Sequence, residues 1–154
     1  MKKKNKNDLL IFIYYIIFAL AVLSTLTVFM EALYTEFHTL GLTSEKFNSY
    51  RGYQIAFGNE DLAASPLAII AYFLPLLAAI SLLIASTHKY AKRMLFLTSI
   101  LLYLSLVLKL LLPYYIPIPL VLGLRIKFGI PLIVDVAVTG FNSLLGFGTA
   151  IFIK

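Results

Sequence analysis

The stretch LLIFIYYIIFALAVLSTLTVFM, residues 9–30, decides how this chain folds. It has no charged residue, and it is about as long as the ~20 residues that a helix needs to cross ~30 Å of hydrocarbon. Three further apolar runs of similar length follow it, at residues 67–86, 94–112 and 133–153. The sequence therefore predicts an all-α membrane protein, a bundle of four transmembrane helices.

Composition indicates a single domain. Hydrophobic residues make up 61% of the 154 residues, against about 45–50% in an average soluble protein. The spans take up more than half of the chain, and the remainder is too short for a separate soluble core. We expect one integral membrane domain over residues 1–154, with outer loops 31–65 and 113–132 and a cytoplasmic loop 87–93.

The distribution of basic residues predicts the orientation, because loops rich in Lys and Arg stay in the cytoplasm. With both termini inside, eight basic residues face the cytoplasm: Lys2, Lys3, Lys4, Lys6, Lys89, Lys92, Arg93 and Lys154. Only four face outward: Lys46, Arg51, Arg125 and Lys127. We therefore expect a multi-pass protein of the plasma or inner membrane with cytoplasmic termini.

The basic residues also bear on nucleic-acid binding and on whether the first span is a cleavable signal peptide. The formal charge of +6 is concentrated at span ends, where it meets lipid headgroups, so we expect no nucleic-acid partner. The basic leader, the apolar run and the triplet Ala19-Leu20-Ala21 also fit the outline of a cleavable signal peptide. Apolar sequence continues through Val22–Met30, which favours a retained first helix.

The outer loops contain two short alternating segments bounded by glycine, Tyr53–Phe57 and Leu124–Phe128. This pattern is typical of strands. We expect either a small extracellular β-hairpin or two-stranded sheet, or two loops at the membrane interface. A helix-start pattern occurs at Thr43–Lys46, and Ser65-Pro66 suits the start of the second span. The prolines of residues 113–119 predict an irregular segment after the third span.

Polar side chains within the spans follow helical stripes, because residues three or four apart share a helix face. One stripe holds Ser24, Thr27 and Glu31, and a second holds Thr98, Ser105 and Lys109. The sharpest stripe lies on the fourth span: Asp135, Thr139, Asn142, Ser143, Gly146 and Ala150.

These stripes have two interpretations. The candidate binding cluster is an outward-opening polar cavity, and its residues are Glu31, Lys109, Asp135, Thr139, Asn142 and Ser143. Alternatively, the stripes mark where the helices meet, with Gly146 and Ala150 allowing a close approach. In that case Lys109 pairs with Asp135 or Glu31, or extends to the outer surface.

The motifs of common enzymes are missing. There is no cysteine, and the two histidines, His38 and His88, fall on opposite sides of the predicted membrane. A zinc site needs three or four ligands, and neither a nucleophile elbow nor a phosphate loop occurs. We expect no enzyme, no metal and no cofactor.

The leading expectation is therefore a non-enzymatic interaction or scaffold subunit of the cell membrane. Its partners would be the lipid bilayer and either other membrane proteins or further copies of itself. The alternative is a small oligomeric channel or transporter that uses the outer-leaflet polar cluster, because four helices alone leave little room for a lumen.

Overall fold

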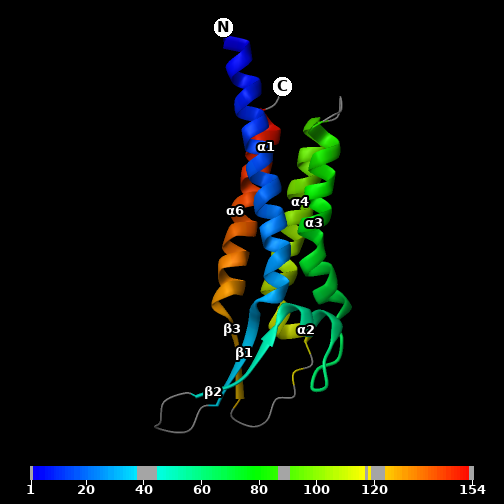
Figure 1. Ribbon diagram of the computed structural model, residues 1–154, viewed down its shortest axis with the longest axis vertical. Coiled ribbons are helices and arrows are strands. Elements are labelled where there is room, and N and C mark those ends of the chain that lie inside the picture. The colour runs from blue at the N-terminus through cyan, green and yellow to red at the C-terminus, as the bar shows by residue number, and fades with distance from the viewer. Residues whose placement is uncertain (1, 38–44, 87–90, 117, 119–123, 153–154) are drawn as a thin grey trace.

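Four long helices run side by side in the computed structural model, which describes residues 2–37, 45–86, 91–116, 118 and 124–152 (Figure 1). They are α1 (Lys2–Leu26), α3 (Pro66–Ser86), α4 (Ala91–Leu110) and α6 (Ile130–Phe152). Each helix is long and apolar enough to cross a membrane, which suggests a membrane protein. The four predicted runs are thus confirmed as helices.

The helix ends follow local sequence signals. Pro66 begins α3, where its missing N–H is not needed, and Ser65 accepts a hydrogen bond from the Ala68 N–H through its backbone oxygen, at 3.0 Å. The helix continues through Pro75 without a break. α1 ends in a 3-10 turn, η1 (Thr27–Phe29), and α4 begins at Ala91, within the loop that the sequence placed at 87–93.

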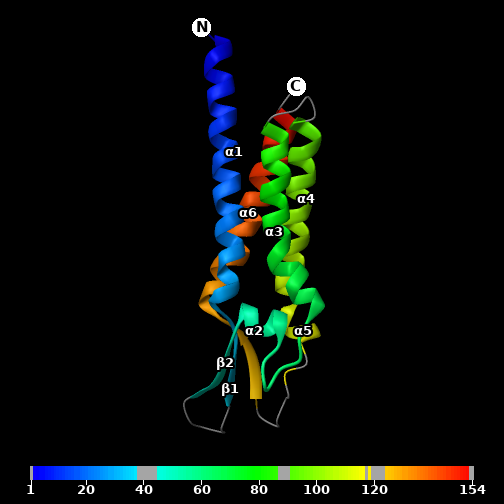
Figure 2. The ribbon, with the colours of Figure 1, turned by 45° about the vertical axis from the view of Figure 1, so that its right-hand side comes forward.

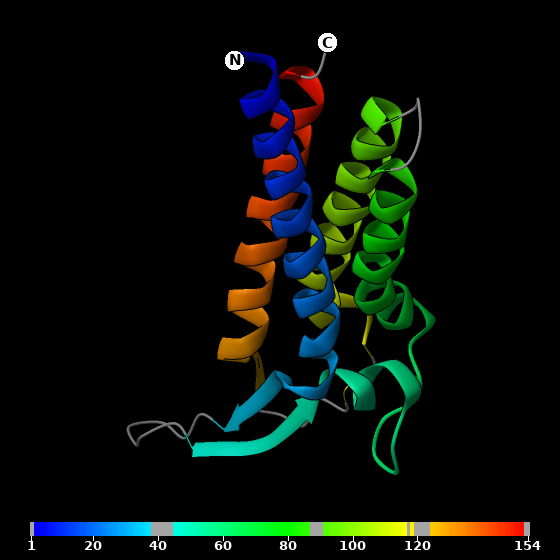
Figure 3. The same cartoon turned by 45° about the horizontal axis from the view of Figure 1, so that its top comes forward.

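The helices form a bundle in which α4 packs against both α3 and α6, and α1 packs against the same two helices. α1 begins and α6 ends at the same end of the bundle, which Figure 2 shows from a second side. A small sheet lies at the opposite end, and Figure 3 shows β1 and β2 lying across it.

The sheet has three antiparallel strands in the order β2-β1-β3. They are β1 (Glu31–Phe37), β2 (Glu45–Arg51) and β3 (Leu124–Phe128). Alternation along the central strand turns Leu33 and Thr35 inward, and both are buried. The expected strand at Leu124–Phe128 is confirmed, but its partner is β1, in a segment for which the sequence predicted no strand.

Three local predictions were wrong. Tyr53–Phe57 belongs to a short helix, α2 (Gly52–Phe57), which begins where the Arg51 N–H donates to Gln54 Oε1 at 2.8 Å. Glu45 and Lys46 start β2 rather than a helix; Thr43 and Ser44 lie outside the described residues. Pro113 belongs to a four-residue helix, α5 (Leu112–Tyr115), whose first turn needs no proline N–H.

Two apolar clusters fill the bundle, one at each end. The cluster beside the sheet includes Val28, Leu33, Ile55 and Tyr72. The cluster toward the termini includes Ile17, Ala78, Leu82 and Leu102. Between the two clusters, α1, α4 and α6 each contribute buried polar side chains, among them Ser24, Lys109 and Asp135. These side chains form a polar layer, and this layer contains the candidate site.

Candidate functional site

An ion pair forms the centre of the polar layer. Lys109, in the last turn of α4, places its Nζ 2.6 Å from Asp135 Oδ2, in the second turn of α6. Neither side chain has any exposed area. α4 and α6 pack together, and both residues face the bundle axis, so the helix stripes predicted from sequence bring the two charges into contact.

Lys109 has two further partners. Its Nζ donates a hydrogen bond to Ser24 Oγ on α1, at 2.8 Å, and lies 5.4 Å from the centre of the Tyr72 ring on α3. An ammonium group has three N–H donors. The carboxylate, the hydroxyl and the aromatic face together surround it on three sides, and they come from three different helices.

Asp135 is equally well supported. Its Oδ2 also accepts a hydrogen bond from Thr27 Oγ1 at 2.8 Å, and its Oδ1 accepts one from Thr139 Oγ1 at 3.3 Å. Thr139 and Ser24 share a further hydrogen bond of 2.8 Å between their hydroxyls. The network therefore closes on itself through α1, α4 and α6.

This closure explains how two charges are accommodated in an apolar bundle. A buried charge is costly unless it is paired and hydrogen-bonded, and ionisable residues within spans usually face protein. Here each charged group has its counter-charge and at least one hydroxyl partner. The arrangement stabilises one packing of the helices, and binding of another ion in the same place would require the pair to separate.

Asn142 and Ser143 lie further along α6 and bond to other helices. Asn142 Nδ2 donates to the Ile17 backbone oxygen on α1 at 3.0 Å, and Ser143 Oγ donates to the Ser99 backbone oxygen on α4 at 3.0 Å. Both residues are buried. They connect helices near the middle of the bundle, and these bonds do not involve the ion pair.

Further hydroxyl groups do the same between α3 and α4. Ser105 Oγ donates to the Ala71 backbone oxygen at 2.6 Å, and the Ser81 and Thr98 hydroxyls lie 2.7 Å apart. Interhelical bonds of this kind are the common use of Ser and Thr in membrane bundles. The stripe positions Thr98 and Ser105 therefore lie at a helix interface.

Glu31 lies apart from the other candidate residues. The first helix ends before it, so Glu31 begins β1 and pairs with Lys46 of β2 in a partly exposed ion pair. A similar pair joins Lys127 of β3 to Glu36 of β1, whose hydrogen bond raises the pKa of Lys127. The outer face of the sheet thus carries its own charge pairs, separate from the buried one.

Three members of the network were not among the candidate site residues. Ser24 and Thr27 share a helix face and were visible as a polar stripe in the sequence. Tyr72 gave no such signal, because a tyrosine within a long apolar run is compatible with many positions. Its hydroxyl has no hydrogen-bond partner among the described residues, and neither do the Tyr14 hydroxyl and Asn142 Oδ1.

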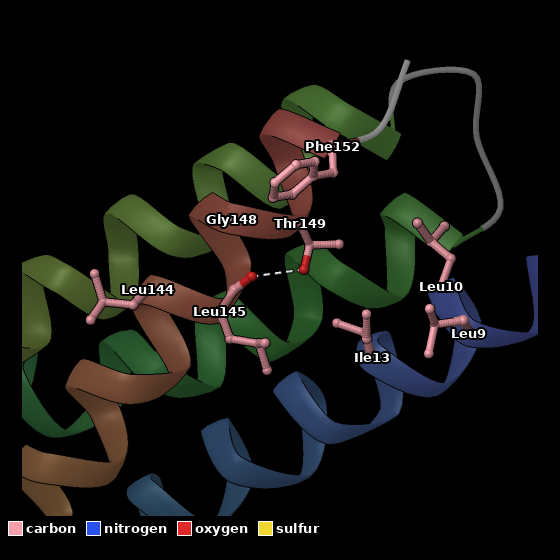
Figure 4. Close-up of a pocket in the computed structure, with 8 residues that line it drawn as sticks. All are labelled: Leu9, Leu10, Ile13, Leu144, Leu145, Gly148, Thr149 and Phe152. Atoms are coloured by element: carbon pink, nitrogen blue, oxygen red, sulfur yellow. Dashed lines mark hydrogen bonds between the residues drawn. The ribbon is translucent and has the colours of Figure 1, made fainter. Parts of the chain in front are cut away.

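Two apolar grooves follow the seam between α1 and α6. One, of about 340 Å³, lies beside the ion pair and is lined by apolar side chains together with Ser24, Thr27 and Asp135. The other, of about 430 Å³, lies near the termini between Leu9, Leu10 and Ile13 of α1 and the last turns of α6 (Figure 4). Its sole side-chain hydroxyl, that of Thr149, is bonded to the Leu145 backbone oxygen at 2.7 Å.

The described residues offer little for metal chemistry. No three histidine, aspartate or glutamate side chains gather within the part of the chain that the structure describes. His38 and His88 lie outside that part.

Comparison with known proteins adds no further information: no family model, no curated protein and no solved structure matches the chain.

Proposed function

We propose that this protein is a four-span integral protein of the plasma or inner membrane, with both termini in the cytoplasm. In this proposal it acts as a non-enzymatic interaction subunit: it docks partner helices in the bilayer and presents its three-stranded sheet outside. The outer face of that sheet, with the pairs Lys46–Glu31 and Lys127–Glu36, is the polar surface it would present.

The observation that carries the proposal is the closed ion pair. Lys109 and Asp135 are held by hydroxyl groups of neighbouring helices and have no exposed area. A site for a solute needs polar groups that are available to bind it, whereas the two charges here bind one another, although Asp135 also lines the groove of about 340 Å³. The same layer would hold the four helices in one arrangement, as a scaffold requires. Large apolar side chains such as Phe12, Leu104 and Leu144 are exposed on the outside of the bundle, where partner helices would dock.

Insertion and orientation can be tested directly because the chain has no cysteine. Ser49→Cys, on the exposed surface of β2, should react in intact cells with a membrane-impermeant maleimide. Ala91→Cys, at the opposite end of the bundle, should react only after the membrane is permeabilised. The reverse pattern would invert the orientation, and release of the protein by alkaline carbonate would refute insertion.

Partner docking is tested by affinity purification from native membranes after mild cross-linking. One exposed apolar residue on each long helix is replaced by tryptophan: Phe12, Leu77, Leu104 or Leu144. A docked helix would be displaced by the substitution on its own contact face, while the other three variants serve as matched controls. Recovery of monodisperse wild-type protein without any stoichiometric partner would contradict the proposal.

A small oligomeric channel or transporter is the second candidate, and one observation favours it. The groove beside the ion pair reaches Asp135 from the outside of the bundle, so a modest separation of α1 from α6 would expose the carboxylate. Purified protein in liposomes should then move an ion or small solute, and Asp135→Asn should stop the flux. Absence of flux across a panel of ions and solutes would exclude this candidate.

A further inference from the structure

A third groove lies between the first turns of α4 and the last turns of α6, at the end of the bundle opposite the sheet. It has a volume of about 530 Å³ and is lined by Lys92, Arg93, Phe96, Ala150 and Ile151. Figure 2 shows the end of α6 beside the start of α4. Unlike the two grooves on the seam of α1 and α6, this groove is lined by two basic residues.

The lining divides into a basic part and an apolar part. Lys92 and Arg93 are exposed and belong to the first turn of α4, which contains no acidic residue. Phe96 follows one turn further into the bundle with 49% of its surface exposed. Its ring packs edge-on against Phe147 of α6, with 5.2 Å between ring centres. Ile151 completes the apolar part and is exposed over 72% of its surface.

The charged side chains that line the groove, those of Lys92 and Arg93, have one sign. Six of the seven acidic residues of the chain belong to the sheet end or to the buried ion pair, and only Asp8, on α1, lies toward the termini. No acidic side chain lines the groove. A negatively charged group in the groove would therefore be attracted by two cations, and no carboxylate among the lining residues would repel it.

We propose that this groove binds an anionic glycerophospholipid. Lys92 and Arg93 contact the phosphate, and an acyl chain lies along Phe96 and Ile151 toward the middle of the bundle. Basic pockets between membrane helices on the cytoplasmic side bind anionic headgroups in this way. The proposal requires membrane insertion but does not depend on the docking of a partner protein.

The apolar half of the groove distinguishes a lipid from a free phosphate. A soluble anion would use only the two cations, whereas three of the five lining residues are apolar and would face it without contributing. A lipid uses both halves, because Phe96 follows the cationic residues by one helical turn and can contact an acyl chain whose phosphate is bound by Lys92 and Arg93. The geometry also places the headgroup at the helix ends, where the membrane interface would lie.

The test is native mass spectrometry of the detergent-solubilised full chain, titrated with phosphatidylglycerol or with phosphatidylcholine of identical acyl chains. We expect phosphatidylglycerol to bind about tenfold more tightly, since each basic residue near a membrane surface attracts anionic lipid. Inorganic phosphate at millimolar concentration should not displace it. Equal binding of the two lipids, or full displacement by phosphate, would overturn the proposal.

Two variants examine the two halves of the groove. The double variant K92Q/R93Q should lose the preference for phosphatidylglycerol. The control variant K2Q/K3Q removes the same amount of charge from α1, at the same end of the bundle, and should retain the preference. Ile151→Trp keeps both cations, fills the apolar half and should weaken binding of phosphatidylglycerol severalfold. Loss of the preference in K2Q/K3Q would indicate general surface attraction instead of a site.

Folding of each variant is checked by circular dichroism and gel filtration. If K92Q/R93Q does not give the wild-type profile, Ile151→Trp decides the question, because Ile151 lies on the outside of the bundle and its replacement leaves the core unchanged. Unchanged affinity in a folded Ile151→Trp variant would refute the acyl-chain position.

Discussion

Lys109 Nζ lies 2.6 Å from Asp135 Oδ2 in a layer that has an apolar cluster on either side. The two residues are 26 positions apart in the sequence. α5 and β3 lie between them in the sequence. The pair therefore joins the end of α4 to the start of α6, although the intervening chain leaves the bundle to form a strand of the sheet. The hydroxyl groups of Ser24, on α1, and Thr27, in η1, complete the contact. This relationship gives the bundle a specific register, and it can be tested by removing one charge or both.

Asp135→Asn should destabilise the fold substantially. The amide has no charge, so the Lys109 ammonium would remain buried without a counter-charge, and breaking a buried pair in this way costs about 3–5 kcal/mol. The measurement is unfolding in mixed micelles followed by circular dichroism. Glu31→Gln, in the partly exposed pair with Lys46, is the matched control and should cost less than about 1 kcal/mol. Equal losses in the two variants would contradict the assignment of Asp135 to a buried ion pair.

Replacing both charges should restore much of that stability. In the double variant Lys109→Met/Asp135→Leu no unpaired charge remains, and a hydrophobic replacement of a buried pair is often neutral or stabilising. We therefore expect a coupling energy of at least about 2 kcal/mol between the two positions in a double-mutant cycle. Additive single effects would show that Lys109 and Asp135 do not act together.

The sequence was sufficient for the helices because hydrophobic length is a strong local signal. It was also sufficient to place Lys109 and Asp135 on inward stripes, since a continuous helix carries residues three and four apart on one face. The prediction that Glu31 shares this stripe was wrong for the same reason. α1 ends at Leu26, and η1 and then β1 follow, so Glu31 does not belong to a helix. A stripe predicts neighbours only for as long as the helix continues.

The segments at the sheet end of the bundle were predicted less well for a different reason. Tyr53–Phe57 alternates as a strand does, but a segment of this length is equally compatible with one and a half turns of helix. What decides its conformation is the interaction between Arg51 and Gln54 at its start, and the packing of Ile55 and Ala56 into the core. β1 was hidden because its charged and polar residues pair across the sheet, which local hydrophobicity does not report.

Gly129, which joins β3 to α6 in the chain, lies so close to the start of β1 that no other residue type fits. A Cβ at this position would lie 2.6 Å from the backbone oxygen of Glu31, and a backbone atom held in a sheet cannot move aside. Gly129→Ala should therefore cost about 1–3 kcal/mol of unfolding free energy. Gly140→Ala is the control, because its Cβ would meet the Leu106 side chain at an ordinary 3.7 Å. A loss at Gly140 as large as that at Gly129 would argue against the close contact between Gly129 and Glu31.

Gly146 offers the most exacting test of how α4 and α6 pack. A Cβ at position 146 would lie 2.3 Å from Ser99 Oγ but 3.5 Å from Ser99 Cβ, so the conflict comes from the hydroxyl alone. Gly146→Ala should cost about 1–3 kcal/mol by overpacking, and adding Ser99→Ala should recover most of it. Gly148→Ala is the control: nothing lies within 4 Å of its Cβ, and alanine favours the helix by up to about 1 kcal/mol.

The rescue is the decisive part of this experiment. Ser99 Oγ bonds to the Leu95 backbone oxygen within its own helix, at 2.9 Å, so Ser99→Ala alone should change stability little. If the double variant remained as unstable as Gly146→Ala, the two helices would not meet at this point, and the arrangement of the polar stripe on α6 would have to differ as well. Recovery would place Gly146 against Ser99, and with it the inward orientation of Asp135, Thr139, Asn142 and Ser143 on the same face.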